Sequence, residues 1–260
     1  MGSFFNLVQN ENMKIYRRIR TWIMAAIILV VPILIGVVTY FNTKPQGMPG
    51  AWNMFSNISS LYMLVTIFSV IIFSDIVASE FTWGTIKLLL IRPWTRSKIL
   101  LSKLLAGLIF TLFLTILFVA ANFAISFFMF PNKPSLDNAL PGSYTPAAYY
   151  MENLLYRYVD LLVISLFAFM ISTLFRTSGI AIGVGIFLQF ASNIFQVIFN
   201  PEKFAWAKYL LFNNMDLSVY MLGGGKDGMT FGFSVAVLVV YAAVFLVISW
   251  LVFARRDVSA

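Results

Sequence analysis

The sequence contains no cysteine and no histidine, and only 11% of its 260 residues are charged. Without cysteine the chain can form no disulfide and offers no thiolate nucleophile. Without histidine it lacks the side chain that serves most often as a metal ligand or as an acid–base group near neutral pH. No cluster of carboxylates outside the apolar runs takes their place. We therefore expect no catalytic residue, no cofactor and no metal in this chain, and we do not expect an enzyme.

Nucleotide-binding loops are also missing from the sequence. The pattern G-x-x-x-x-G-K-[ST] does not occur, and the glycine run 223–225 fails to complete it because Asp227 follows Lys226. The 18 Lys and Arg residues give a net charge of +8, yet they are dispersed between apolar runs rather than gathered in one basic domain. We therefore predict no ATP hydrolysis by the isolated chain and no binding to nucleic acid.

Apolar residues, by contrast, make up 60% of the chain, which is more than a soluble domain of this size can bury. A helix of roughly 20 apolar residues crosses a bilayer, and six segments satisfy that requirement: residues 22–40, 58–78, 99–130, 158–174, 179–199 and 231–254. The third segment is longer than one span needs, so we expect Lys98 and Lys103 to be solvated. The sequence predicts an all-α integral membrane protein with one domain over residues 1–260.

The segment before the first span, residues 3–21, is amphipathic. At about 100° per residue, Val8, Ile15 and Ile19 fall on one helical face, while Lys14 points elsewhere. This pattern favours an interfacial helix that either anchors the chain on anionic headgroups or acts as an elbow that passes movement to the first span.

Basic residues are distributed unequally between the two ends of the spans. Twelve of the 18 lie near the termini and in the loops after the second and fourth spans, and the other six lie at the opposite ends. The positive-inside bias therefore places both termini and these two loops in the cytosol.

The loop after the second span, residues 79–98, is charged and yet strongly apolar, so it must rest on a surface. Pro93 is expected to end a first short helix, and Thr95 is expected to cap a second helix that continues into the third span. From these features alone, the surface beneath the loop can be lipid or a partner protein.

Several residues of this loop resemble the intracellular coupling segment of permease subunits from bacterial type-2 ABC exporters. The likeness rests on Glu80, Gly84 and Thr85, a leucine-rich turn, Arg92-Pro93, Arg96 and Lys103. The elbow, the six spans, the cytosolic termini and the chain length are similar to the same family. The resemblance implies a cytosolic coupling helix after the second span, and contacts to a separate ATP-binding subunit at Glu80, Phe81, Gly84, Thr85, Lys87, Leu88, Arg92 and Arg96.

The resemblance also implies partners and a location. It predicts a permease homodimer or heterodimer in the bacterial plasma membrane, with ATP and Mg held by the partner subunit. Small external loops and the scarcity of charge within the spans favour an amphipathic or lipidic substrate over an ion. Relatives of this size include exporters that clear peptide antibiotics from the membrane, and such a role would confer antibiotic resistance.

Weakly polar side chains recur at helical spacing on two of the predicted spans. They are Ser59, Tyr62, Thr66 and Ser69 on the second span, and Gln189, Asn193 and Gln196 on the fifth. The resemblance gives these stripes the role of lining a substrate path, whereas their spacing fits hydrogen bonds between helices equally well. Gly179 and Gly183, in GxxxG spacing, permit a close approach by another helix of this chain or of a second copy.

Two other functional classes remain open. A secondary transporter or channel would show carboxylates at mid-membrane, broken helices or repeated halves. The aspartates of the spans, Asp75 and Asp160, lie instead near helix ends, where Arg157 could pair with Asp160. A membrane enzyme lacks the necessary site chemistry. The sequence therefore favours an ATP-driven export permease, with a secondary transporter or channel as the alternative.

Overall fold

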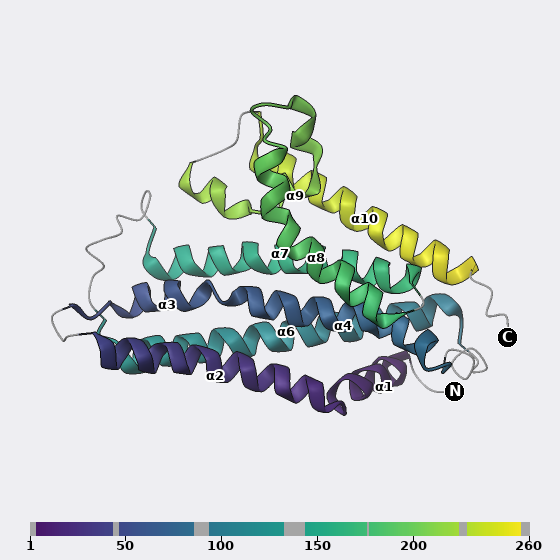
Figure 1. Cartoon of the computed structure of the whole chain (residues 1–260), viewed down its shortest axis with the longest axis horizontal. Coiled ribbons are helices and arrows are strands. Elements are labelled where there is room, and N and C mark those ends of the chain that lie inside the picture. Colours follow the sequence, from purple (N-terminus) through teal and green to yellow (C-terminus); the bar gives the residue numbers. More distant parts are fainter. Residues whose placement is uncertain are drawn as a thin grey trace.

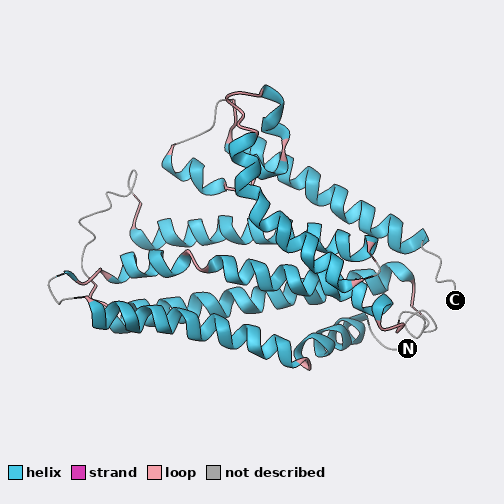
Figure 2. Cartoon of the chain, in the orientation of Figure 1, coloured by secondary structure: helices cyan, strands magenta, loops and turns pink. Residues whose placement is uncertain are grey.

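The structure is a computed structural model that describes residues 4–43, 47–85, 94–132, 144–175, 177–223 and 228–255. Within these ranges every regular element is a helix (Figure 2). In chain order the elements are α1 (Phe4–Tyr16), α2 (Ile19–Asn42), α3 (Ala51–Ser59), α4 (Tyr62–Thr82), α6 (Arg96–Met129), α7 (Pro146–Leu174), α8 (Ser178–Ile198), the 3-10 helix η2 (Ala205–Tyr209), α9 (Leu211–Asn214), the 3-10 helix η3 (Leu217–Leu222) and α10 (Phe231–Arg255). The all-α prediction is confirmed.

Among the described residues, five helical segments are long and apolar enough to cross a membrane: α2, α3 and α4 taken together, α6, α7 and α10. The sixth predicted span, residues 179–199, falls on α8, whose continuous apolar part is shorter, Ser178–Ser192. The chain is thus a multi-pass membrane protein whose described part holds five membrane-length helical segments, and the sixth span stays a prediction.

Local signals explain where two of the long helices begin. The Thr95 hydroxyl accepts a hydrogen bond from the backbone N–H of Lys98 at 3.4 Å, which confirms the predicted cap of α6. The Thr145 hydroxyl caps α7 in the same way, and Pro146 occupies the first turn, where its missing N–H leaves no bond unmade. Helix α7 therefore begins well before the predicted residue 158.

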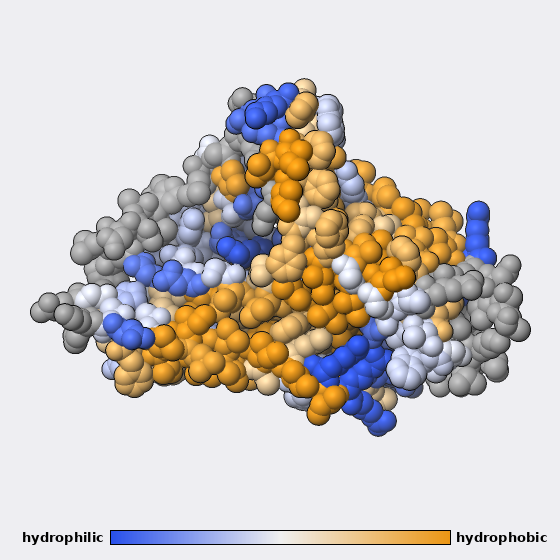
Figure 3. Space-filling view, in the orientation of Figure 1, coloured by the Kyte–Doolittle hydropathy of each residue, from blue (hydrophilic) through white to orange (hydrophobic). Residues whose placement is uncertain are grey.

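Helices α2, α4, α6 and α7 run side by side, and the start of α1 and the end of α10 lie at the same end of the bundle (Figure 1). Helix α4 lies at the centre and contacts α6, α7 and α8. A Cβ at Gly107 of α6 would lie 2.6 Å from the ring of Phe73 on α4, so only glycine permits this approach. On the lipid-facing exterior, apolar residues form a broad surface (Figure 3), as expected of a protein solvated by hydrocarbon.

Candidate functional site

The candidate site lies at the end of the bundle that holds α1, the last turn of α4 and the first turns of α6. We call this end the amino-terminal face. Helix α1 packs on α6, where the ring of Tyr16 meets Phe110 and Phe113 edge to face, with centroids 6.2 and 5.6 Å away. Val8 and Ile15 of α1 are buried in the protein, whereas Ile19 is exposed. The face predicted to rest on the membrane is therefore partly used to bind α6.

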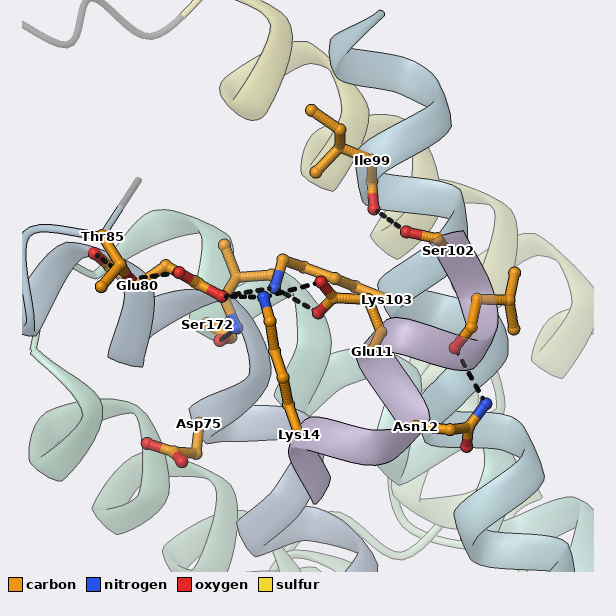
Figure 4. A network of polar contacts seen from close by, with 12 residues as sticks. Glu11, Asn12, Lys14, Asp75, Glu80, Thr85, Ile99, Ser102, Lys103 and Ser172 are labelled. Atoms are coloured by element: carbon orange, nitrogen blue, oxygen red, sulfur yellow. Dashed lines mark hydrogen bonds and ion pairs between the residues drawn. The ribbon is translucent and has the colours of Figure 1, made fainter. Parts of the chain in front are cut away.

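Four charged side chains from three helices form a buried network beneath α1 (Figure 4). The Lys103 ammonium lies 2.7 Å from a Glu11 carboxylate oxygen and 3.1 Å from one of Glu80. The Lys14 ammonium lies 2.8 Å from an oxygen of each of the same two carboxylates. Each carboxylate thus contacts two cations, and each cation two carboxylates. We call these four residues the charge network.

Three of the four side chains in the charge network are almost completely shielded from water. Lys103 and Glu11 are only 1% and 2% exposed, and Glu80 is 7% exposed. An ion in such a place is tolerated only when opposite charges and hydrogen bonds compensate for lost water. The expectation that Lys103 would be solvated is wrong, because Glu11 and Glu80 give it partners in the protein.

The pKa values of Glu11 and Lys14 in α1 are set by two opposing effects, burial and ion pairing. Burial by itself would raise the pKa of Glu11, but the ammonium groups of Lys103 and Lys14 outweigh burial and hold that pKa below its usual value. Burial would likewise lower the pKa of Lys14, but Glu11 and Glu80 outweigh it and raise that pKa. Both shifts keep the groups charged across the neutral range.

Two further contacts fasten α4 to its neighbours at this face. Arg18, just before α2, and Arg20, in its first turn, both donate to the same carboxylate oxygen of Asp75 on α4; the Arg18 bond is 2.6 Å long. On the other side of α4, the Ser172 hydroxyl of α7 accepts from the backbone N–H groups of Val77 and Ala78 at 3.1 and 3.0 Å. The last turns of α4 are therefore held by α2, α6 and α7 together.

A cleft of about 830 Å³ opens beside the charge network. It is lined by Lys14, Arg18, Ile19, Arg20, Asp75, Ser79, Glu80, Trp83, Thr85 and Ser178. Its walls thus come from the α1–α2 junction, the end of α4 and the start of α8. The surface at the α1–α2 junction is hydrophilic and borders the broad apolar surface on one side (Figure 3).

The structure places five of the eight predicted coupling residues at this face. Glu80 is directed into the charge network and also accepts a hydrogen bond from the Thr85 hydroxyl. Phe81 packs partly buried against the core, and Gly84 ends the helix with a positive φ of 67°. Arg96, at the start of α6, donates to the carbonyl of Ala254 in α10 at 3.0 Å. The other three, Lys87, Leu88 and Arg92, lie outside the described residues, and the coupling role stays a prediction.

The polar stripe on the second predicted span points into the protein. Ser59 accepts a hydrogen bond from the Asn122 amide of α6 at 3.0 Å, and the Tyr62 hydroxyl bonds to Thr115 of α6 at 3.0 Å. Thr66 and Ser69 donate to backbone carbonyls of their own helix. The bonds of Ser59 and Tyr62 are the interhelical hydrogen bonds that the spacing allowed, whereas those of Thr66 and Ser69 stay within their own helix. The path role stays a prediction.

The polar residues on the fifth predicted span differ in their hydrogen bonding. Gln196 donates to the carbonyl of Phe212 at 2.7 Å, which ties α8 to α9. The Gln189 carbonyl oxygen is buried and has no hydrogen-bond partner among the described residues. The side chain of Asn193 lies outside the described set. The possible Arg157–Asp160 ion pair is not formed among the described residues, where Arg157 donates to Asn153 at 2.9 Å.

Comparison with known proteins gives a family and two similar chains. A family model described as "Protein of unknown function (DUF2705)" matches residues 18–259. An "Uncharacterized protein YhcI" of Bacillus subtilis is 34% identical over 217 residues, covering 80% of this chain and 69% of that protein. An "Uncharacterized membrane protein YdbK" of the same organism is 32% identical over 209 residues, covering 76% of this chain and 80% of that protein.

Proposed function

Because the chain belongs to the DUF2705 family, whose description assigns no activity, we propose from its own residues that it is the transmembrane permease subunit of an ATP-driven exporter. A separate ATP-binding subunit supplies ATP and Mg. The substrate is amphipathic or lipidic, with a peptide antibiotic as the leading case, and the chain works in the bacterial plasma membrane with both termini in the cytosol.

One observation carries this proposal: the loop expected to receive the ATPase subunit emerges directly from the charge network. Glu80 stands at the end of α4 and is bound to Lys14 of α1 and Lys103 of α6. A displacement applied between residues 80 and 96 therefore acts on three helices at once, since their ends are fastened by buried ion pairs. A loop that merely rested on lipid would need no such fastening.

A permease of this kind needs a second membrane subunit, and α8 offers a surface for it. A Cβ placed on Gly179 or Gly183 would meet no atom within 4 Å. Among the described residues these glycines therefore bring no helix of the same chain close. The face continues through exposed Phe187 and Ile194. Small residues that leave the backbone accessible favour helix association in membranes, and we propose that this face meets the second permease chain.

The test of the coupling role uses Gly84, since a change at Glu80 would also disrupt the charge network. Gly84 has a positive φ, and a Cβ there would meet open space. Gly84→Asn serves as the matched control, because asparagine tolerates this conformation. Gly84→Trp should prevent docking of an ATP-binding subunit encoded beside this gene, whereas Gly84→Asn should preserve it. The measurements are co-purification and ATP hydrolysis in nanodiscs, and equal behaviour of the two variants and the wild type would rule the coupling role out.

One observation favours the alternative, a secondary transporter. The early start of α7, Pro146–Leu174, puts Asp160 near the middle of the helix, so the prediction that it lies near a helix end is wrong. One of its carboxylate oxygens is buried and has no hydrogen-bond partner among the described residues. Unpaired intramembrane carboxylates are typical of proton relays. In liposomes with an imposed pH gradient and no nucleotide, a transporter of this class would admit protons that a trapped pH dye detects, and Asp160→Asn would abolish the signal. The permease proposal expects no such flux in either protein.

A further inference from the structure

We propose that the cleft at the amino-terminal face binds the headgroup of one anionic phospholipid from the adjacent leaflet, a role that does not depend on ATP coupling. Among the described residues, three cations line the cleft, Lys14, Arg18 and Arg20, against two carboxylates, Asp75 and Glu80. The described part of the lining therefore carries one excess positive charge, which matches the single negative charge of a phosphodiester.

The donors in the cleft are only partly used by the protein. Arg18 and Arg20 each give one nitrogen to the same oxygen of Asp75. The Nε of Arg20 is buried and has no hydrogen-bond partner among the described residues. A buried donor left unbonded is costly, and guanidinium groups bind phosphate oxygens with favourable geometry. A phosphate oxygen near Arg20 would supply the missing acceptor.

The first turn of α8 adds a second source of donors. Ser178, its first residue, lines the cleft, and the N-cap Thr177 makes no side-chain cap hydrogen bond. The unpaired backbone N–H groups and the dipole of a helix N-terminus both favour an anion. The N-terminus of α8 and the two arginine side chains belong to different parts of the chain. Two separate features therefore favour an anionic ligand.

The rim of the cleft has the composition of a membrane interface, which selects a lipid over a soluble anion. Ile19 and Trp83 line the cleft and are 78% and 76% exposed. Trp22, one turn from Ile19, is also exposed. Tryptophan is enriched at headgroup depth, and basic pockets between membrane helices bind anionic headgroups. The acyl chains would then lie along the exposed apolar face of α2.

The experiment titrates the purified full chain, in neutral detergent, with phosphatidylglycerol or phosphatidylcholine and counts bound lipid by native mass spectrometry. The wild type should bind phosphatidylglycerol preferentially, and Arg20→Gln should weaken that binding about five- to tenfold, as expected for the loss of one cation–phosphate contact. Arg17→Gln is the matched control: it removes the same charge from an exposed residue outside the lining, and it should change binding less than about twofold.

Asp75→Asn separates binding from folding, because the change frees both arginines from their carboxylate. It should strengthen phosphatidylglycerol binding, whereas a purely structural role of the arginine pair predicts weaker binding. Weakening by Asp75→Asn, an equal loss in Arg17→Gln, or equal binding of the two lipids would each overturn the proposal. Complete displacement of the lipid by inorganic phosphate at equal concentration would assign the cleft to a soluble anion instead.

Discussion

The contacts that surround the two ends of helix α8 differ in kind. Near its first turn, at the amino-terminal face, the helices around it are joined by full charges that meet across long stretches of sequence, as in the Glu11–Lys103 pair. Beyond its last turn, neutral amides bind carbonyls close by in sequence: Asn213 donates to Phe199 and Ala207, and Asn214 to Lys208 and Leu210. The first arrangement responds to charge and pH, whereas the second is indifferent to both.

The largest effect is expected where a buried charge would lose its partner. Lys103→Met leaves Lys14, which is partly exposed, as the only cation that contacts Glu11 and Glu80 among the described residues, and such a change costs roughly 3 to 5 kcal/mol of stability. Lys98→Met is the control, because Lys98 is exposed and lies 5.6 Å over the Trp94 ring; it should cost less than about 1 kcal/mol. Thermal unfolding in detergent measures both, and equal losses would show that Lys103 is not tied into the network.

The amide-bonded end should show a smaller loss that ignores pH. Asn213→Ala removes the donor of the bonds to the carbonyls of Phe199 and Ala207, which are 2.9 and 2.8 Å long. Because both carbonyls lose their partner, the substitution should lower the free energy of unfolding by about 1 to 3 kcal/mol in total. Repeating the unfolding measurement at acid pH should give the same difference from the wild type. A difference that changed strongly with pH would contradict the contrast between the two ends.

Acid should loosen α1 selectively. Because the folded pKa of Glu11 lies below its ordinary value of 4.5, its contribution is complete above that pH and disappears as the pH falls through the folded pKa. Lys14 has a raised pKa, so its contribution is complete below 10.5 and is lost only at higher pH. The protection of α1 amides against hydrogen exchange, relative to the intrinsic rate at each pH, should therefore fall below about pH 4.5, while the protection of α9 stays the same. Unaltered protection of α1 would show that the network does not hold this helix.

The smallest effect should come from the most accessible member of the network. The Lys14 side chain is 38% exposed, so water and salt screen its ion pairs. Lys14→Gln should cost about 0.5 to 1 kcal/mol, and added salt should reduce that difference. Unfolding at low and high salt measures it. A loss of stability as large as that of Lys103→Met would mean that solvent exposure does not determine how much each of these two lysines contributes to stability.

Local features of the fold could be predicted from the sequence, and long-range pairings could not. Thr95 before an apolar run identified the start of α6. The beginning of α7 was missed because Glu152, Asn153 and Arg157 interrupt its apolar pattern. Lys103 looked like a solvated residue because its partner Glu11 is 92 positions away, and periodicity contains no information on such distances. Asn122 on α6, which bonds to Ser59, was missed for the same reason.

The separation of Glu11 from Lys103 also has a consequence for biosynthesis. At about 5 to 20 residues per second, a ribosome needs roughly 5 to 20 s to proceed from one codon to the other. During that interval Glu11 lacks Lys103, its most deeply buried partner, so the nascent α1 must remain at the aqueous surface. We infer that α1 docks only once α6 has been inserted. Crosslinking from a probe at Leu7 to α6 should therefore appear only in arrested chains long enough to expose Lys103, and crosslinks to lipid should dominate in shorter ones.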